Sequence, residues 1–308
     1  MKTILFHENQ LGLRGTSVAL YDYALFNETI LGNKSIICVP NKTEDLSSLE
    51  KFRNRFSIFF YEKLEETYKI PHDIFYSIKY GHNDGIINPN VKSCIHVVFP
   101  CFDPHGNVYA YVSKWLSEQY HNFPHVPHMI SLPKVDKNFR KELGIDKEKL
   151  VFGWSGGNNF EIDFARKAVA DCASKRKDVV FIFMNQDPFC QLENVLFLRP
   201  TYDLDSKVAF INTCDAMIHA RLRGETFGLS IGEFSSRNKP IITYSESPEK
   251  NHIQVLGQKG MYYKNYEELY FLLMNLDKKE IENKDWNCYQ EFEPEKVMKI
   301  FNDVFIKN

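Results

Sequence analysis

The sequence predicts an α/β fold of two doubly wound domains, each with a parallel sheet covered by helices on both faces. Short runs rich in β-branched and aromatic residues alternate with longer helical patterns along the whole chain. The predicted strands are nearly continuously apolar, which is typical of parallel sheets that are buried on both sides. This alternation occurs once in each half of the 308 residues, and it therefore favours two domains of similar architecture.

The expected elements follow from these patterns in chain order. The first half has predicted strands at residues 3–7, 35–39, 57–61, 73–79 and 94–100. The second half has predicted strands at residues 150–154, 179–184, 194–198, 215–220 and 239–243. Helical patterns cover residues 16–30, 109–120, 161–177, 204–213, 227–237, 265–276 and 294–306.

A stretch rich in proline and charge, residues 125–149, separates the two halves and precedes a new strand. Such a stretch is typical of a linker between domains. We therefore expect an N-terminal domain at residues 1–132 and a C-terminal domain at residues 133–292. In open α/β sheets, ligands bind at the carboxyl ends of the strands, so the crevice between two such sheets is the expected ligand site.

Composition narrows the class of protein. Hydrophobic residues make up 44% and charged residues 25% of the chain, as in ordinary globular proteins. The net charge of −2 argues against a general nucleic-acid binder. No apolar run approaches the roughly 18 residues that would suggest a membrane span, and the first residues do not form a signal peptide. Seven scattered cysteines, none in a C-x-x-C pair, indicate reduced thiols in a cytoplasmic protein.

The stretch GETFGLSIGEF, which follows a predicted buried strand, predicts an anion site at the start of a helix. Thr226 is the expected N-cap of a helix over residues 227–237. The N–H groups of Phe227, Gly228 and Leu229 would then lack acceptors within the helix. Together with the helix dipole, such N–H groups bind phosphate.

Two glutamates flank this helix start, with seven residues between them. At 1.5 Å rise per residue, Glu225 and Glu233 would lie roughly 12 Å apart along the helix axis. A diphosphate that links a sugar to a ribose has about that reach. One carboxylate could accept hydrogen bonds from the sugar and the other from the ribose, with the phosphates on the N–H groups between them.

This pair of glutamates, followed by KPIIT, resembles the signature of the retaining GT-B glycosyltransferases. The stretches LGLRGTSVALYDYA and YVSKWLSEQ extend the resemblance over most of the chain, and FGWSGG and HARLRGETFG are closest to small members encoded by large viruses. The resemblance implies two Rossmann-like domains that face a central cleft, with Glu225 as a catalytic residue on the sugar and Glu233 on the ribose. It also implies a last helix, residues 293–308, that packs back on the first domain and buries Phe301 and Phe305.

A glycine-bearing loop follows the first strand. Gly12 and Gly15 permit close approach of the backbone, and Thr16 or Ser17 can cap the next helix. By resemblance, Gly15 and its neighbours contact the diphosphate of the donor, and Arg14 supplies positive charge there. The alternative is a simple connection between a strand and a helix.

His96 is the polar residue of the apolar run SCIHVVFP. By resemblance it matches a catalytic histidine beside the transferred sugar and the acceptor. The alternative is a core histidine that is hydrogen-bonded to the backbone. Three further histidines at 121, 125 and 128 are expected on the surface or in the linker, because their spacing does not suit a metal ion.

The chain departs from the family's pattern where the second domain opens. Trp154 stands where many members carry an arginine, and Lys167 lies too far along to serve as their lysine. Arg221 and Arg14 are the expected substitutes at the diphosphate. Trp154 could stack on a sugar or fill the core, and the sequence leaves both alternatives open.

The function expected from these observations is transfer of a sugar from a nucleoside-diphosphate sugar, such as a UDP- or GDP-sugar, to a hydroxyl of a glycan or glycoprotein. By resemblance the transfer retains the anomeric configuration and needs no metal or other cofactor. The expected location is the cytoplasm, of the host if the chain is viral. The alternatives are a nucleotide-sugar-binding protein with weak or lost turnover, and an epimerase or phosphorylase of the same architecture.

Overall fold

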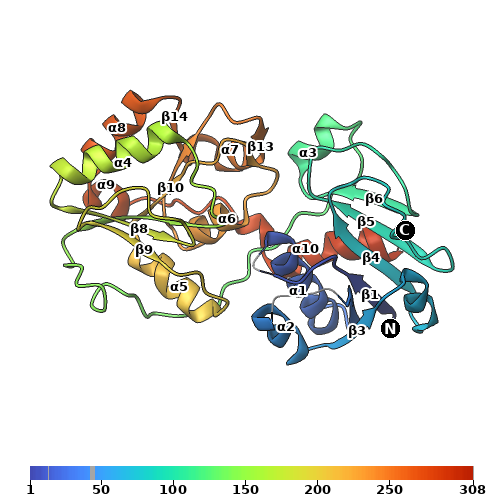
Figure 1. The fold of residues 1–308 in the computed structure, drawn as a ribbon. Coiled ribbons are helices and arrows are strands. Elements are labelled where there is room, and N and C mark those ends of the chain that lie inside the picture. Colours follow the sequence, from blue (N-terminus) through green and yellow to red (C-terminus); the bar gives the residue numbers. More distant parts are fainter. Residues whose placement is uncertain (13, 42–45, 308) are drawn as a thin grey trace. The chain divides into compact units, whose positions relative to one another are not determined.

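The structure is a computed structural model that describes residues 1–12, 14–41 and 46–307. The chain forms two compact units (Figure 1). Unit 1 contains residues 1–131 and 291–308, and unit 2 contains residues 132–290. These boundaries lie within two residues of those expected from the sequence; Asn308, the last residue of the expected helix, lies outside the described residues.

Unit 1 is built on a six-stranded parallel sheet with the strand order β3-β2-β1-β4-β5-β6. The strands are β1 (Thr3–His7), β2 (Lys34–Pro40), β3 (Ser57–Tyr61), β4 (Ile74–Lys79), β5 (Lys92–Val97) and β6 (Val108–Tyr111). The register sets Thr3 beside Lys34 and Ile4 beside Ile74. All six positions of β4 are buried, as expected for a central strand that is covered on both faces.

The helices of unit 1 include one from the far end of the chain. They are α1 (Gly15–Thr29), α2 (Leu46–Arg53), α3 (Lys114–Gln119) and α10 (Pro294–Phe301), with a 3₁₀ turn at Leu64–Lys69 and a π-helical turn at Asn302–Lys307. Pro294 occupies the first turn of α10, where its missing N–H is not needed. Phe301 and Phe305 are fully buried, and both lie about 5.3 Å from the ring of Tyr76 in β4. The prediction that they bury in the first domain is confirmed.

Unit 2 repeats the architecture with the strand order β14-β12-β10-β7-β8-β9. The strands are β7 (Leu150–Ser155), β8 (Val179–Met184), β9 (Val195–Leu198), β10 (Ala216–His219), β12 (Ile241–Tyr244) and β14 (Met261–Tyr263). A separate ribbon pairs β11 (Gly224–Glu225) with β13 (Glu249–Lys250). The helices are α4 (Asp163–Lys175), α5 (Leu204–Thr213), α6 (Leu229–Ser236), α7 (Asn251–Leu256), α8 (Tyr266–Asn275) and α9 (Lys278–Glu282), with 3₁₀ turns at Gly257–Lys259 and Gln290–Phe292.

The expected helix over 109–120 is wrong in its first part. Residues 108–111 form β6, which pairs in parallel with β5. Tyr109 and Tyr111 are buried there, and aromatic residues favour strands. The helix α3 begins only after Ser113, whose hydroxyl accepts a hydrogen bond from the N–H of Leu116 at 3.2 Å. The elements α2, α7, α9, β14 and the ribbon β11–β13 were not expected from the sequence.

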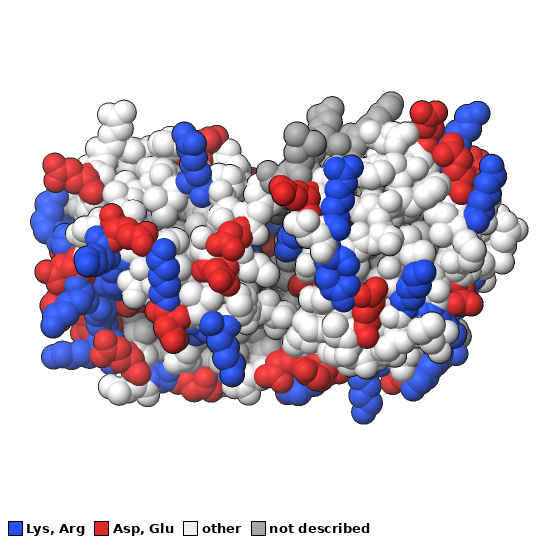
Figure 2. All heavy atoms as spheres, turned by 90° about the horizontal axis from the view of Figure 1, so that it is seen from below, with Lys and Arg blue, Asp and Glu red and all other residues white. Residues whose placement is uncertain are grey.

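Charges of both signs are interspersed over the face of the molecule shown in Figure 2. That face therefore lacks the continuous basic surface on which phosphate backbones bind. No helix in the described ranges combines the length and the apolar content needed to cross a lipid bilayer.

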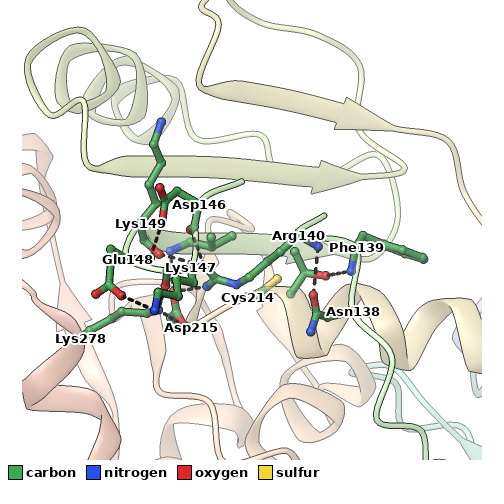
Figure 3. A network of polar contacts seen from close by, with 12 residues as sticks. Asn138, Phe139, Arg140, Asp146, Lys147, Glu148, Lys149, Cys214, Asp215 and Lys278 are labelled. Atoms are coloured by element: carbon green, nitrogen blue, oxygen red, sulfur yellow. Dashed lines mark hydrogen bonds and ion pairs between the residues drawn. The ribbon is translucent and has the colours of Figure 1, made fainter. Parts of the chain in front are cut away.

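Asp215 ties the segment before β7 to the amino edge of the sheet in unit 2 (Figure 3). Its carboxylate accepts hydrogen bonds from the N–H of Val151 and from Nη2 of Arg140, both at 2.7 Å. Arg140 also donates to the carbonyls of Asp146 and Lys149. The network therefore joins residues 140–151 to the start of β10, at the sheet edge opposite to the carboxyl ends of the strands.

Replacement of Asp215 by alanine should lower the free energy of unfolding by about 2 kcal/mol, because the N–H of Val151 and Nη2 of the largely buried Arg140 lose their acceptor. Urea denaturation measures the loss. Asp163→Ala is the matched control, since 97% of the Asp163 side chain is exposed. If the two variants unfold at the same urea concentration, the structural role of Asp215 is contradicted.

Candidate functional site

The candidate site in unit 2 begins where β10 ends. The chain leaves β10 at His219, turns at Gly224 and places Glu225 on the ribbon beside Lys250. Gly224 has a φ of 78°, and a Cβ atom there would lie 2.0 Å from the carbonyl oxygen of Glu249. Only glycine fits such a position. The position of Glu225 therefore depends on a glycine at 224.

Glu225 is held as an anion by two neighbours. Its Oε2 accepts a hydrogen bond from Nη1 of Arg221 at 2.9 Å, and its Oε1 lies 3.2 Å from Nε2 of His219. Burial alone would raise the pKa of Glu225, but the hydrogen bond from His219 and the charge of Arg221 lower it to about 2. Nδ1 of His219 lies 2.9 Å from Oγ1 of Thr243, so both nitrogens of this histidine are engaged.

The helix that follows starts later than expected. Gly228 is the N-cap of α6, with a left-handed φ of 92°, and Leu229 is the first helical residue. The predicted roles of Thr226 as the N-cap and of Phe227 as the first helical residue are therefore wrong. The reason is tertiary: the carbonyl of Phe227 accepts hydrogen bonds from Asn251 and Tyr289, which keeps residues 226–227 out of the helix.

The anion-binding end of α6 is shifted accordingly. The first N–H group with an acceptor inside the helix is that of Gly232, which donates to Gly228 at 2.9 Å. The N–H groups of Leu229, Ser230 and Ile231 therefore make up the orphan first turn, at the positive end of the helix dipole. Residues 226–228 lead into this turn and do not belong to it.

Glu233 lies within α6, and Glu225 lies outside it. Only about 6 Å of helical rise separates Leu229 from Glu233, so the estimate of 12 Å along one axis is wrong. One carboxylate oxygen of Glu233 pairs with Nζ of Lys207 from α5. The other is buried and has no hydrogen-bond partner among the described residues. A buried acceptor of this kind is suited to a ligand hydroxyl.

Arg221 and Trp154 both contact neighbouring side chains of unit 2. Arg221 neutralises Glu225. Trp154 is 2% exposed and packs against Phe160 and His219, with ring centroids 5.7 and 5.5 Å away. Of the two alternatives, Trp154 fills the core. Lys167 pairs with Asp171 on its own helix.

In unit 1 the glycine loop leads directly into α1. Arg14 is the N-cap, in extended conformation and with no side-chain cap, and Gly15 and Thr16 open the helix. The N–H of Gly12 donates to Oγ of Ser17 at 3.1 Å, and that hydroxyl donates to the carbonyl of Gln10 at 3.2 Å. Ser17 therefore braces the loop, and the N–H groups at the start of α1 have no side-chain cap.

Glu8, directly after β1, was not identified from the sequence. It is 6% exposed. One carboxylate oxygen accepts the N–H of Asn9 at 3.2 Å, and the other has no partner within the described part of the chain. Burial raises the pKa of Glu8 to about 7, against the opposing effects of Asn9, Thr16 and Arg14. The signal in the sequence was a single acid that ends an apolar strand.

His96 lies in the core of unit 1. It is fully buried, with Nδ1 2.6 Å from the hydroxyl of Tyr76 and Nε2 2.8 Å from the carbonyl of Val126. Burial lowers its pKa to about 3. His128, expected on the surface or in the linker, is also buried and packs against it at 5.5 Å. The structure favours the alternative of a core histidine, and it corrects the expectation of a catalytic His96.

The structure therefore gathers Arg221, Glu225, the start of α6 and Glu233 in unit 2. It gathers Gly12, Arg14, Gly15 and Thr16 at the start of α1 in unit 1. The side chains that sequence reasoning missed in unit 2 are His219, Arg223, Glu249 and His252. Glu249 and His252 contact the loop between β10 and α6 from β13 and α7, whereas His219 and Arg223 lie in the stretch HARLRGETFG, in which they were not singled out.

No model of a known protein family matches the chain, and no curated protein sequence does. Solved structures do match it over nearly its whole length. Anabaena Alr3699/HepE in complex with UDP-glucose has a TM-score of 0.67 at 13% identity, over 99% of this chain and 96% of that one. A glycosyltransferase from Rickettsia africae ESF-5 has a TM-score of 0.65 at 12% identity, and the match covers 100% of this chain and 99% of that one.

A proposed UDP-N-acetylglucosamine 2-epimerase from Listeria monocytogenes is also similar, with a TM-score of 0.63 at 12% identity, over 98% of this chain and 95% of that one. At such identities the likeness concerns the fold. Both units carry a six-stranded parallel sheet between helices, and the similar structures include glycosyltransferases of this architecture. The chain therefore has the GT-B fold.

Proposed function

We propose that the chain transfers a sugar from a nucleoside-diphosphate sugar to a hydroxyl group of an acceptor. The observation that carries this proposal is the anionic Glu225, held by Arg221 and His219 directly before the uncapped start of α6. A carboxylate accepts hydrogen bonds from sugar hydroxyls, and a helix start binds phosphate. Glu233, with one buried oxygen unused, is proposed to accept from the ribose.

The proposed donor is a UDP-sugar. HepE, which shares the fold, was solved with UDP-glucose and with UDP and glucose. In this proposal the N–H groups of residues 229–231 hold the diphosphate, with Arg221 as the basic side chain of unit 2. Preorganised charge at the leaving group is a large part of catalysis, and one such donor contributes roughly 3 kcal/mol.

The proposed reaction retains the anomeric configuration and uses no metal ion. The bond between the sugar C1 and the phosphate oxygen breaks, and the acceptor oxygen bonds to C1 on the same face. The leaving phosphate oxygen takes the acceptor proton, so no carboxylate serves as a covalent nucleophile. The proposed acceptor is a glycan or a glycoprotein, and the proposed location is the cytoplasm, of a host cell if the chain is viral.

A first experiment is a thermal-shift screen with the diphosphates of uridine, guanosine, adenosine and thymidine and their sugars. A ligand at about 100 times its dissociation constant stabilises the native state by roughly 2.7 kcal/mol. Release of free nucleoside diphosphate only when acceptor sugars are added supports transfer. Binding without release supports the alternative of a binding protein.

An epimerase is the second candidate, because the Listeria protein shares the fold. The two reactions differ in their need for an acceptor. Interconversion of UDP-N-acetylglucosamine with its 2-epimer in the absence of any acceptor would support the epimerase and contradict the transferase.

Replacement of Glu225 by glutamine should weaken binding of UDP-glucose about tenfold, because a neutral amide replaces the charged acceptor of the sugar hydroxyls. Binding of UDP should change less than twofold. Isothermal titration calorimetry measures both. Glu246→Gln, at an exposed position after β12, is the matched control and should leave both affinities unchanged. Equal losses for UDP and UDP-glucose would contradict the assignment of Glu225 to the sugar.

A further inference from the structure

Three side chains around the chain segment 219–228 keep buried polar atoms that make no hydrogen bond to other described residues. They are Nε1 of Trp154, both ring nitrogens of His252 and Oε2 of Glu249. The three residues are 2%, 0% and 3% exposed. A buried polar atom without a partner costs about 1–3 kcal/mol, so three such residues around one short segment require an explanation.

The three residues converge from different elements. The His219 ring lies 5.5 Å from the ring of Trp154 in β7 and 5.1 Å from the ring of His252 in α7. Glu249, on β13, uses its other oxygen to accept from Nε of Arg223. A Cβ atom added to Gly228 would lie 3.5 Å from Cβ of His252. His252 therefore lies beside His219 and the N-cap of α6, Trp154 lies beside His219, and Glu249 lies beside Gly224 on the ribbon.

The polar atoms of His219 itself are all used, by Thr243 and Glu225. The deficit is therefore confined to its neighbours. Burial lowers the pKa of His252 to about 3, although the charge of Glu225 acts in the opposite direction. His252 is consequently neutral at pH 7 and offers one N–H donor and one acceptor. Trp154 offers a donor only, and Glu249 offers an acceptor.

Mixed donors and acceptors match hydroxyl groups, each of which both donates and accepts. They do not match a phosphate, which accepts only and would be repelled by the carboxylates of Glu225 and Glu249. For the same reason they do not match a sugar that carries a carboxylate. The chemistry that satisfies all the unused atoms is a neutral sugar with free hydroxyl groups.

We propose that Trp154 and His252 hydrogen-bond the hydroxyl groups of the donor's sugar and select a neutral hexose over an acidic one. The inference rests on the proposed function, since it concerns the sugar of the same donor. In it, Trp154 has a role despite its place in the core: its ring packs inside unit 2, and its buried N–H, which has no partner among the described residues, would donate to a sugar hydroxyl. The residue that departs from the family's pattern thus recognises the sugar.

The test compares a nucleotide with its sugar conjugate, so that contacts to the sugar are measured alone. Trp154→Phe removes the indole N–H and keeps an aromatic ring. Its dissociation constant for UDP-glucose should rise about five- to twentyfold, and that for UDP should stay within twofold. Trp286→Phe is the matched control, because the Trp286 N–H already donates to the carbonyl of Ile281 at 3.0 Å. It should change neither constant.

His252→Phe supplies an independent variant if Trp154→Phe does not fold. It should produce the same selective loss of affinity for UDP-glucose. The unchanged chain should also bind UDP-glucose at least tenfold more tightly than UDP-glucuronate. Wild-type affinity of both variants for UDP-glucose, or equal losses for UDP and UDP-glucose, would overturn the inference.

Failure of the proposed function gives a different result. If the unchanged chain binds neither UDP nor UDP-glucose, the comparison is repeated with GDP and GDP-mannose. Binding of none of these four probes contradicts the proposed function itself, and the inference falls with it. Binding of a nucleotide and its sugar with equal affinity by the unchanged chain contradicts the inference alone.

Discussion

Replacement of Phe301 by alanine should lower the free energy of unfolding of unit 1 by about 3–5 kcal/mol, the range for phenylalanine in a close-packed core. Phe301 is fully buried. Its ring lies 5.1 Å from the ring of Tyr23 in α1 and 5.3 Å from those of Tyr76 in β4 and Phe305. Alanine would leave a cavity among these three aromatic rings, because the strand and the helices that carry them cannot all move inward.

The measurement is urea denaturation, followed by hydrogen exchange that is resolved by peptide. Faster exchange should appear in residues 1–131, although the substitution lies near the carboxyl end of the chain. Phe271→Ala on α8 is the matched control, since Phe271 is 66% exposed and surface substitutions usually change stability by less than about 0.5 kcal/mol. A chain that ends before Pro294 should lose even more, because it lacks all of α10. Faster exchange in unit 2 alone would contradict the assignment of α10 to unit 1.

The sequence predicted the strands and helices correctly where the pattern of apolar and capping residues is local. The apolar runs TILFH, SIFFY and VVFIFM predicted β1, β3 and β8 with the bounds that the structure has. These strands are short, apolar and followed by turn residues, so the local sequence pattern is enough to predict them without knowledge of tertiary contacts. The helix α5 was predicted with its bounds for a similar reason, because Asp203 caps it through the N–H of Ser206.

The errors occur where distant residues decide the backbone. Thr226 has the right chemistry for an N-cap, but hydrogen bonds from Asn251 and Tyr289 to Phe227 delay the helix to Leu229. Both partners lie more than 20 residues away in the chain. No local pattern contains this information, and tertiary contacts override the capping preference.

In the candidate site, too, residues in a local motif were predicted, and residues brought together by tertiary contacts were not. Glu225 and Glu233 were found because they share one short motif. Glu249 and His252 were missed because they reach the loop of Glu225 only when β13 and α7 are assembled, whereas His219 lies in the stretch HARLRGETFG and was not singled out. His96 was expected to be catalytic by resemblance, but Tyr76 and Val126 already occupy its two ring nitrogens.

Glu8 should make the stability of unit 1 depend on pH in a direction opposite to that of most acids. Burial raises its pKa from 4.5 to about 7 in the folded chain. The folded state therefore binds a proton more tightly than the unfolded state does. The stabilising effect of the protonated form is complete below pH 4.5, decreases between pH 4.5 and 7, and is absent above pH 7. A shift of this size corresponds to about 3 kcal/mol.

Glu8→Gln removes the ionisation and keeps the shape of the side chain. The difference in the free energy of unfolding, variant minus wild type, should therefore rise by about 3 kcal/mol between pH 4.5 and 7.5. Taking this difference removes the contributions of all other titrating groups. Urea denaturation at a series of pH values measures it, and Glu8→Asp is the control, because it keeps a carboxyl group and should keep the decrease. If the difference between Glu8→Gln and wild type stays constant with pH, Glu8 is already ionised in the folded chain, and its second oxygen must then have a partner such as an ordered water molecule.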